Sequence, residues 1–173
     1  MAITRLNTNA FGTSVNLASN VTGTLPAANG GSGRTAVTGN VLQVVQGSNA
    51  TQMTTTSTSF VDTGLTASIT PSSSSNKILI IVDAQGQFAA NTGFGNAIVR
   101  GSTAIFQTNS YSNYDSSATQ TNTRATYCYL DSPSTTASTA YKLQVNAYNP
   151  GTIYQNDGDN KTTMTLMEIA GWL

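Results

Sequence analysis

The sequence of 173 residues contains no histidine, one cysteine and only 14 charged side chains, seven of each sign. Without histidine, the chain lacks the commonest general base and the commonest zinc ligand of proteins. A single cysteine, Cys128, excludes a disulfide within one copy of the chain. Because Cys128 lies between Tyr127 and Tyr129 with no histidine to activate it, we predict a buried structural thiol rather than a nucleophile.

Long apolar runs are also scarce, and the longest one, Ile78–Val82, has five residues. A membrane-spanning helix needs about 20 apolar residues, so we expect no insertion into a membrane. We see no secretory signal, and we expect a protein that is made in a cytoplasm and stays soluble. The net charge of zero creates no field that would attract nucleic acid, so no nucleic-acid partner is expected. Zero net charge also gives no electrostatic protection against self-association, which favours a homo-oligomer.

Polar residues of strands and turns are abundant: the chain has 29 Thr, 19 Ser, 17 Asn and 15 Gly. Threonine favours strands, whereas glycine and asparagine favour the turns between them. Leucine, glutamate and lysine, which favour helices, are few. We therefore predict an all-β protein with an antiparallel β-sandwich or jelly roll.

The first 40 residues differ from the rest, because their apolar side chains are isolated among Thr, Asn, Ser and Gly. Their spacing matches neither a helix nor a sustained strand. We predict an extended attachment arm over residues 1–40 that becomes ordered on a partner, followed by a β-sandwich head over residues 41–173; a disordered tail is the alternative. The residues expected to anchor the arm are Leu6, Phe11, Val15, Leu17, Val21 and Leu25.

Three glycines in the arm, Gly30, Gly31 and Gly33, form a glycine-rich segment with Asn29 and Ser32. Such residues tolerate a positive φ and a close backbone approach. They predict a sharp reversal of the chain direction, or close packing of backbones at a symmetry axis. A flexible hinge is the alternative.

Residues 16–35 resemble a known element, and they read Asn-Leu-Ala-Ser-Asn-Val-Thr-Gly-Thr-Leu-Pro-Ala-Ala-Asn-Gly-Gly-Ser-Gly-Arg-Thr. They are similar to the V-T-G-x-L-P…N-G-G-T-G element of tail fibres and other surface proteins of bacteriophages, including phages of cyanobacteria. Segments within residues 43–80, 101–106, 129–133 and 164–169 resemble a head module that recurs in phage virion proteins. The resemblance implies a non-enzymatic structural protein, made in the host cytoplasm and located in the virion, with a homotrimer as the expected assembly.

The apolar run Ile78–Val82 is bounded by Pro71 and four serines, and it predicts a central strand that is buried on both faces. After Val82 the pattern alternates, so we expect the side chains of Asp83, Gln85 and Gln87 to face water. The chain should be organised around this strand.

Shorter alternating segments predict the other strands. Asp62–Gly64 and Gly101–Ser102 are expected to be turns, the latter a two-residue hairpin turn. Residues 107–123 are expected to form a long loop. In the strand 124–130 we expect Tyr127 and Tyr129 on the face opposite Cys128. The remaining predicted strands cover residues 41–46, 57–61, 65–69, 94–100, 103–107, 141–147, 152–155 and 162–169.

Few side chains could perform chemistry. A glycosidase needs two carboxylates held several ångströms apart, and the seven acids of this chain lie mostly in predicted turns, so we predict no catalytic residue and no enzyme. The segment Asn156–Asn160 is rich in oxygen ligands around Gly158, but it lacks the glutamate of a calcium loop. A hairpin turn is therefore expected, with a cation on a symmetry axis as the alternative. No metal and no cofactor are predicted.

The segment 111–115 is the candidate recognition loop, through Tyr111, Asn113, Tyr114 and Asp115. Tyrosine rings among small hydrogen-bonding side chains suit recognition, including that of a host surface glycan. The alternative is a solvated loop whose tyrosines cover the edge of the sandwich.

Two placements in a virion follow: a tail-fibre-like host-attachment module, or a capsid decoration (cement) protein. The partner of the arm would be a tail protein in the first case and the major capsid protein in the second.

Overall fold

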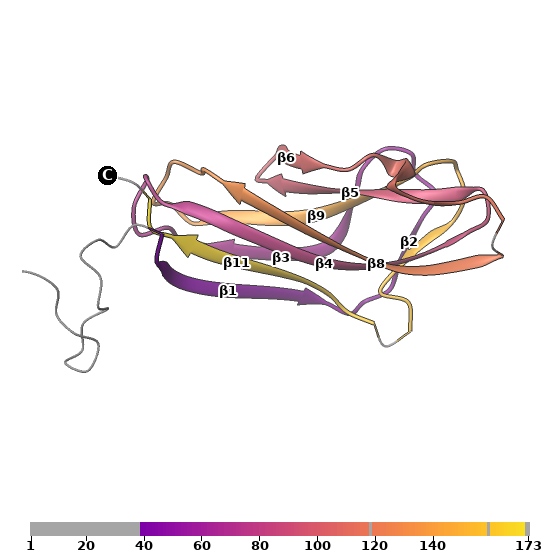
Figure 1. Cartoon of the computed structure of the whole chain (residues 1–173), viewed down its shortest axis with the longest axis horizontal. Helices are drawn as coiled ribbons and strands as arrows, with labels where there is room; N and C mark the ends of the chain where they lie inside the picture. The colour runs from indigo at the N-terminus through magenta and orange to yellow at the C-terminus, as the bar shows by residue number, and fades with distance from the viewer. Residues whose placement is uncertain (1–38, 118, 159, 172–173) are drawn as a thin grey trace, which may run out of the picture. The chain divides into compact units, whose positions relative to one another are not determined.

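In this computed structural model, residues 39–117, 119–158 and 160–171 are described (Figure 1). The predicted arm therefore lies outside the described residues, except for Gly39 and Asn40. The same holds for the six proposed anchoring residues of the arm and for its three glycines.

The described part of the chain contains eleven strands and one 3-10 helix. They lie in two antiparallel sheets, which we call sheet A and sheet B. The all-β antiparallel sandwich predicted from the sequence is confirmed. In chain order the elements are β1 (Val41–Asn49), β2 (Met53–Thr55), β3 (Val61–Ile69), β4 (Lys77–Ala89), β5 (Thr92–Arg100), β6 (Thr103–Gln107), η3 (Ser110–Ser112), β7 (Asn113–Asp115), β8 (Gln120–Asp131), β9 (Thr139–Ala147), β10 (Ile153–Gln155) and β11 (Thr162–Ile169).

Sheet A has the order β1-β11-β4-β10-β2, and β8 pairs with β4 along most of its length. Sheet B has the order β3-β9-β5-β6, and β7 adds a short pairing to β5. Neighbours in sheet A are often far apart in the sequence, because the last strand, β11, lies between β1 and β4. Figure 1 shows the strands of both sheets running along the same direction of the body.

Strand β4 is the longest and supplies much of the core. Its side chains Ile78, Ile80, Val82 and Ala84 are fully buried between the sheets. They belong to one apolar cluster with residues of β3, β5, β9 and β11. The other buried members of this cluster are Leu65, Ala67, Ile69, Ile98, Tyr141, Leu143, Met164 and Leu166. The prediction that the chain is organised around this strand is confirmed.

The predicted exposure along β4 is confirmed at Asp83, whose side chain is 39% exposed, but it is wrong on both sides of this residue. Leu79 and Ile81 are only half-buried, so the run Ile78–Val82 is not buried on both faces. Gln85 and Gln87, which were expected to face water, are buried. The turn after β10 lies over them: Asp157 donates its backbone N–H to Gln85 Oε1 at 3.1 Å, and Gln87 Nε2 donates to Asp157 Oδ2 at 2.7 Å.

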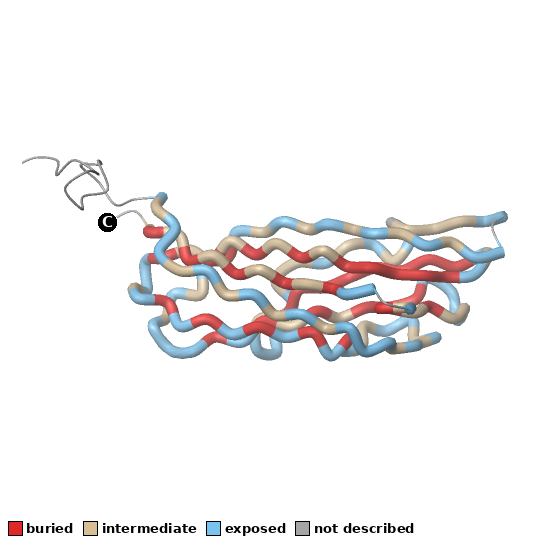
Figure 2. The backbone as a smooth tube through the Cα atoms, turned by 90° about the horizontal axis from the view of Figure 1, so that it is seen from below, coloured by how far each residue is buried: buried red, intermediate tan, exposed pale blue. Residues whose placement is uncertain are grey.

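Strand β5 is buried on both faces, and Figure 2 shows a continuous buried stretch beside strands that alternate. Phe94 and Ile98 point into the core. On the other face, a Cβ at Gly95 would lie 2.8 Å from the Ser110 backbone nitrogen, so the segment after β6 covers β5 closely. Asn96 joins the sheets, because its Oδ1 accepts a hydrogen bond from the Tyr127 hydroxyl of β8 at 3.1 Å.

Two predictions about connections are wrong, and one is confirmed. The chain does not turn at Asp62–Gly64: β3 runs through this segment, and Gly64, at φ +82°, lies where the register with β9 shifts. Residues 107–123 are not one loop, since they contain η3, β7 and the beginning of β8. The hairpin at Gly101–Ser102 is confirmed, with Gly101 at φ +59° between β5 and β6.

Candidate recognition site

Three tyrosines from separate elements gather at one place, and we call them the tyrosine cluster: Tyr111 in η3, Tyr114 in β7 and Tyr148 just after β9. The rings of Tyr111 and Tyr114 are stacked, with centroids 4.4 Å apart and an interplanar angle of 15°. The Tyr148 ring stands edge-on to both, at 4.7 Å from Tyr111 and 5.5 Å from Tyr114.

Backbone pairing to β5 brings the tyrosines together. Gly93 of β5 is the register partner of Tyr114, and its carbonyl accepts a hydrogen bond from the Tyr148 backbone N–H at 2.9 Å. Tyr111 is positioned by Asn109, which caps η3 by accepting the Tyr111 N–H on its side-chain oxygen at 3.0 Å. The cluster is therefore held by a strand of sheet B that is itself buried on both faces.

The four predicted recognition residues separate into two groups. Tyr111 and Tyr114 belong to the cluster, whereas Asn113 and Asp115 hold the loop. Asn113 Nδ2 donates to the Phe94 carbonyl at 3.3 Å. Asp115 accepts the Ser117 backbone N–H at 2.8 Å.

The cluster offers an exposed, largely apolar platform with hydroxyl groups. Tyr111 is 50% exposed and Tyr148 is 39% exposed. Stacked and edge-on rings are favourable arrangements that keep the platform ordered. Such a surface can stack against the apolar face of a sugar ring while the phenol groups form hydrogen bonds to its hydroxyls.

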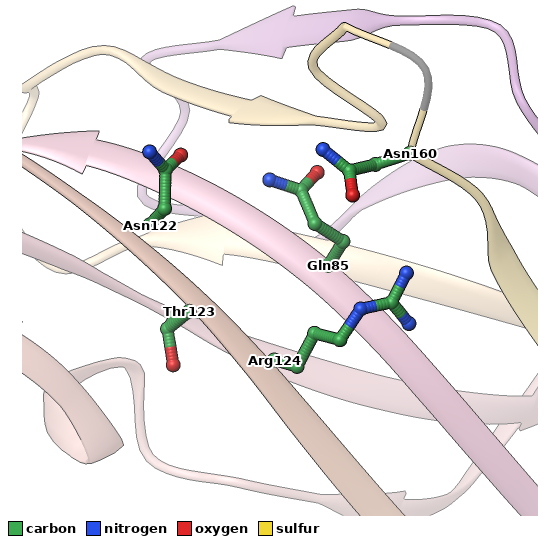
Figure 3. Close-up of a pocket in the computed structure, with 5 residues that line it drawn as sticks. All are labelled: Gln85, Asn122, Thr123, Arg124 and Asn160. Carbon is green, nitrogen blue, oxygen red and sulfur yellow. The ribbon is translucent and has the colours of Figure 1, made fainter.

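A second candidate is a polar cleft of about 210 Å³ on sheet A, lined by Gln85, Asn122, Thr123, Arg124 and Asn160. Figure 3 shows the amides of Gln85, Asn122 and Asn160 on one side of β4 and β8, with Thr123 pointing the other way. Arg124 forms an ion pair with Asp83 and donates to the Lys161 carbonyl at 3.1 Å, so its charge is compensated. The amides of Gln85, Asn122 and Asn160 are also engaged within the protein, with the Asp157 backbone N–H, Gln87 Nε2 and the Asp157 carbonyl respectively, so the cleft assigns no ligand.

The carboxylate of Glu168 is fully buried, and both of its oxygens accept hydrogen bonds from other groups of the protein. Gln43 Nε2 donates to one oxygen at 2.6 Å, and the Ser72 backbone N–H donates to the other at 2.6 Å. Asn76 and the Ser72 hydroxyl add further hydrogen bonds. Burial alone would raise the pKa of Glu168, but these hydrogen bonds outweigh it and lower the pKa to about 2.

Asp131, at the end of β8, is the second buried carboxylate. Its oxygens accept hydrogen bonds from Arg100, at 2.8 Å, and from the Tyr141 hydroxyl, at 2.7 Å. Burial and the adjacent carboxylate both raise the pKa of Tyr141. Through these hydrogen bonds, Glu168 and Asp131 each connect elements that are distant in the sequence.

The predicted burial of Cys128 is wrong, because its side chain is exposed. Alternation along β8 points Tyr127 and Tyr129 inward, where their rings lie 5.7 and 5.8 Å from Phe106. The expected opposite faces are thus confirmed. Cys128 is instead on the outer face of sheet A, opposite Ile81, where no described segment covers it.

In the turn between β10 and β11, the oxygen atoms that could bind a cation accept hydrogen bonds from other groups of the protein. Asp157 accepts hydrogen bonds from Gln52 and Gln87, and Asn160 Nδ2 donates to the Asp157 carbonyl at 2.7 Å. Within residues 39–117, 119–158 and 160–171, no group of three or more His, Cys, Asp or Glu side chains is placed to hold a metal ion. None of the helices in this part of the chain is long and apolar enough to cross a membrane.

A family model described as eukaryotic translation initiation factor eIF2A matches residues 37–169, a range that includes all eleven described strands. The chain belongs to this family. No curated protein matches the sequence. The description of the eIF2A family names a translation factor, and it assigns no role to the tyrosine cluster or to the polar cleft.

Among solved structures, a chain in the structure of infectious bursal disease virus Gx strain aligns with 75% of this chain, at 12% identity and a TM-score of 0.41. The alignment covers 37% of the viral chain, so this chain spans little more than a third of its length.

Proposed function

We propose that this chain is a non-enzymatic, tail-fibre-like attachment module on the surface of a bacteriophage virion, and that the tyrosine cluster contacts a glycan of the host surface. The observation that carries the proposal is the cluster of Tyr111, Tyr114 and Tyr148, in which the Tyr111 and Tyr148 rings are exposed and all three come from separate elements. The phage setting rests on the resemblance of the sequence to phage surface proteins.

The physical argument for recognition is pre-organisation. Tyrosine supplies a large contact area while few torsions must be fixed on binding. Here the rings already contact one another, and β7 and the end of β9 are hydrogen-bonded to β5. Binding therefore requires little further ordering of the protein, which favours affinity.

The arm completes the proposal. Residues 1–40 would anchor the body to other virion proteins, and the chain would act as a homotrimer. Gly39 and Asn40 belong with the body, since their backbones exchange hydrogen bonds with Ala170 at 2.9 Å. Deletion of residues 1–38 should therefore leave a folded body that no longer attaches to virions, and persistent attachment would refute the role of the arm.

The alternative placement is a capsid decoration protein that stabilises the phage head. The two placements differ in copy number: a fibre-like module is expected at tens of chains or fewer per particle, and a decoration protein at hundreds. Quantitative mass spectrometry of purified virions separates them. Degradation of host polysaccharide by the purified chain would contradict the non-enzymatic proposal in either placement.

Membership in the eIF2A family favours a second candidate function, a role in translation initiation. The chain has seven basic and seven acidic side chains, so no net charge supports binding to ribosomal RNA. Sedimentation of the full chain with ribosomes distinguishes the candidates. Salt-resistant co-sedimentation would favour the translation role, whereas free chain that is recovered in virions would favour the attachment role.

A further inference from the structure

Tyr114 and Tyr148 flank Gly93 of β5 on the outer face of sheet B. Phe94 and Ala147 are register partners that point into the core, so the adjacent positions Gly93 and Tyr148 face outward. Gly93 is also the register partner of Tyr114 in β7. Because Gly93 carries no side chain, it leaves room for the two tyrosine rings to approach each other, with centroids 5.5 Å apart.

Tyr111 supplies most of the accessible aromatic surface of the tyrosine cluster. Tyr114 stacks against one face of the Tyr111 ring, yet Tyr111 is 50% exposed. Its exposure therefore comes from the opposite face and from the rim of the ring. One free ring face offers a stacking surface for a single sugar ring.

The chain around the cluster carries almost no charge. In residues 107–118 and 144–152, which contain the three tyrosines, the one charged side chain is Asp115. It follows Tyr114 directly and accepts hydrogen bonds from the Ser117 backbone N–H at 2.8 Å and from the Thr121 hydroxyl at 3.2 Å. Both donors are uncharged, so these hydrogen bonds leave the negative charge of the carboxylate beside the rings.

The described basic side chains lie away from the cluster. In sheet B, Arg100 is seven positions along β5 from Gly93, and Lys142 is six positions along β9 from Tyr148. At about 3.3 Å per residue, these separations are roughly 23 and 20 Å. The other described basic residues belong to sheet A or to the turn that leads into it: Lys77, Arg124 and Lys161. Arg124 pairs there with Asp83, on the other layer of the sandwich.

We propose that the sugar bound by the tyrosine cluster is a neutral pyranose, and that the cluster selects against acidic sugars such as uronic and sialic acids. This inference rests on the proposed attachment function and narrows its ligand. A neutral pyranose stacks its apolar C–H face on Tyr111 and offers hydroxyl groups to the phenols. A ligand carboxylate would instead be repelled by the negative ring faces and by Asp115, and would meet no described basic partner.

The test measures binding of the full chain to surface polysaccharide of host cells, separated by anion exchange into a neutral and an acidic fraction. The wild type should bind the neutral fraction at least tenfold more tightly. This binding should change less than twofold between about 50 and 500 mM salt, because no ion pair forms. Tyr111→Ala should weaken binding of the neutral fraction at least tenfold, since the stacking surface is lost, and should keep the melting temperature of the wild type.

A charge-neutral variant tests the selection itself. Asp115→Asn removes the charge and keeps an oxygen that can accept the Ser117 N–H. The ratio of acidic to neutral binding should rise at least threefold. Asp83→Asn is the matched control, because it removes a carboxylate from sheet A, where Asp83 pairs with Arg124, and it should leave the ratio unchanged. An unchanged ratio in Asp115→Asn would overturn the role of this carboxylate.

The outcomes separate this inference from the attachment function. Preference for the acidic fraction, lost in Tyr111→Ala, would overturn the inference and leave attachment through the cluster standing. Binding to neither fraction would contradict the attachment function itself. Binding of the neutral fraction that is unchanged in Tyr111→Ala and Tyr148→Ala would place the glycan outside the cluster and overturn both.

Discussion

Oε1 of Glu168, in the last strand, accepts a hydrogen bond from the backbone N–H of Ser72 at 2.6 Å, although 96 positions separate the two residues. The other oxygen accepts from Gln43 Nε2 of β1 at 2.6 Å. One carboxylate thus joins β1, β11 and the segment that leads into β4. Because Glu168 is fully buried, removal of its charge should be measurable as a change in stability.

The first prediction concerns Glu168→Gln and pH. The folded-state pKa of Glu168, about 2, lies below its ordinary value of 4.5, so its stabilisation is present above about pH 4.5 and is lost as the pH falls toward 2. The variant should lose roughly 2 to 3 kcal/mol of unfolding free energy at pH 7, and its stability should depend less on pH between 5 and 2. Urea denaturation at pH 7 and pH 3 checks this. A variant with the same pH dependence as the wild type would contradict it.

The second prediction concerns the contact between Gly86 of β4 and Phe94 of β5. A Cβ at position 86 would lie 2.3 Å from the Phe94 ring. Gly86→Ala should therefore destabilise the fold by about 1 to 3 kcal/mol through overpacking. Combining it with Phe94→Leu should cost less than the sum of the two single changes, because the smaller side chain makes room. Additive free energies in denaturant titrations would refute the contact.

The third prediction compares two ion pairs. Asp131 is buried against Arg100 and Tyr141, so Asp131→Ala should destabilise the fold by about 2 to 3 kcal/mol, because it removes the acceptor of the fully buried Tyr141 hydroxyl and the counter-ion of Arg100. Asp62, which is 55% exposed, pairs with Lys142 at the surface. Asp62→Ala should change the unfolding free energy by about 1 kcal/mol or less. Equal losses of unfolding free energy in the two variants, measured by thermal denaturation, would contradict this difference between the two ion pairs.

Alternation along single strands made much of the fold predictable. It gave the all-β class, the hairpin at Gly101–Ser102 and the placement of Tyr127 and Tyr129 on the face opposite Cys128, but not which of these two faces is buried. It could not give the exposure along β4, because that depends on which distant segment covers each end. The turn that buries Gln85 and Gln87 begins about 70 positions later in the chain.

The candidate site could be predicted only in part, because it too depends on pairing between strands that are far apart in the sequence. Tyr111 and Tyr114 lie in one short polar segment, so composition alone pointed to them. Tyr148 joins them because β9 pairs with β5, and no local pattern contains that pairing. The exposure of Cys128 and Leu130 likewise follows from the outer face of sheet A, which no described segment covers at these positions, and the sequence of β8 does not specify that.

The fourth prediction tests the attachment proposal most directly, by the binding of labelled full-length chain to host cells. Wild-type chain should bind saturably, and Tyr111→Ala and Tyr148→Ala should each bind at least tenfold more weakly, since a central aromatic contact is worth about 2 kcal/mol or more. Tyr154→Ala is the matched control, because Tyr154 lies on β10 in sheet A, outside the cluster. Wild-type chain that does not bind host cells, or cluster variants that bind as tightly as wild type with unchanged melting temperatures, would contradict the account.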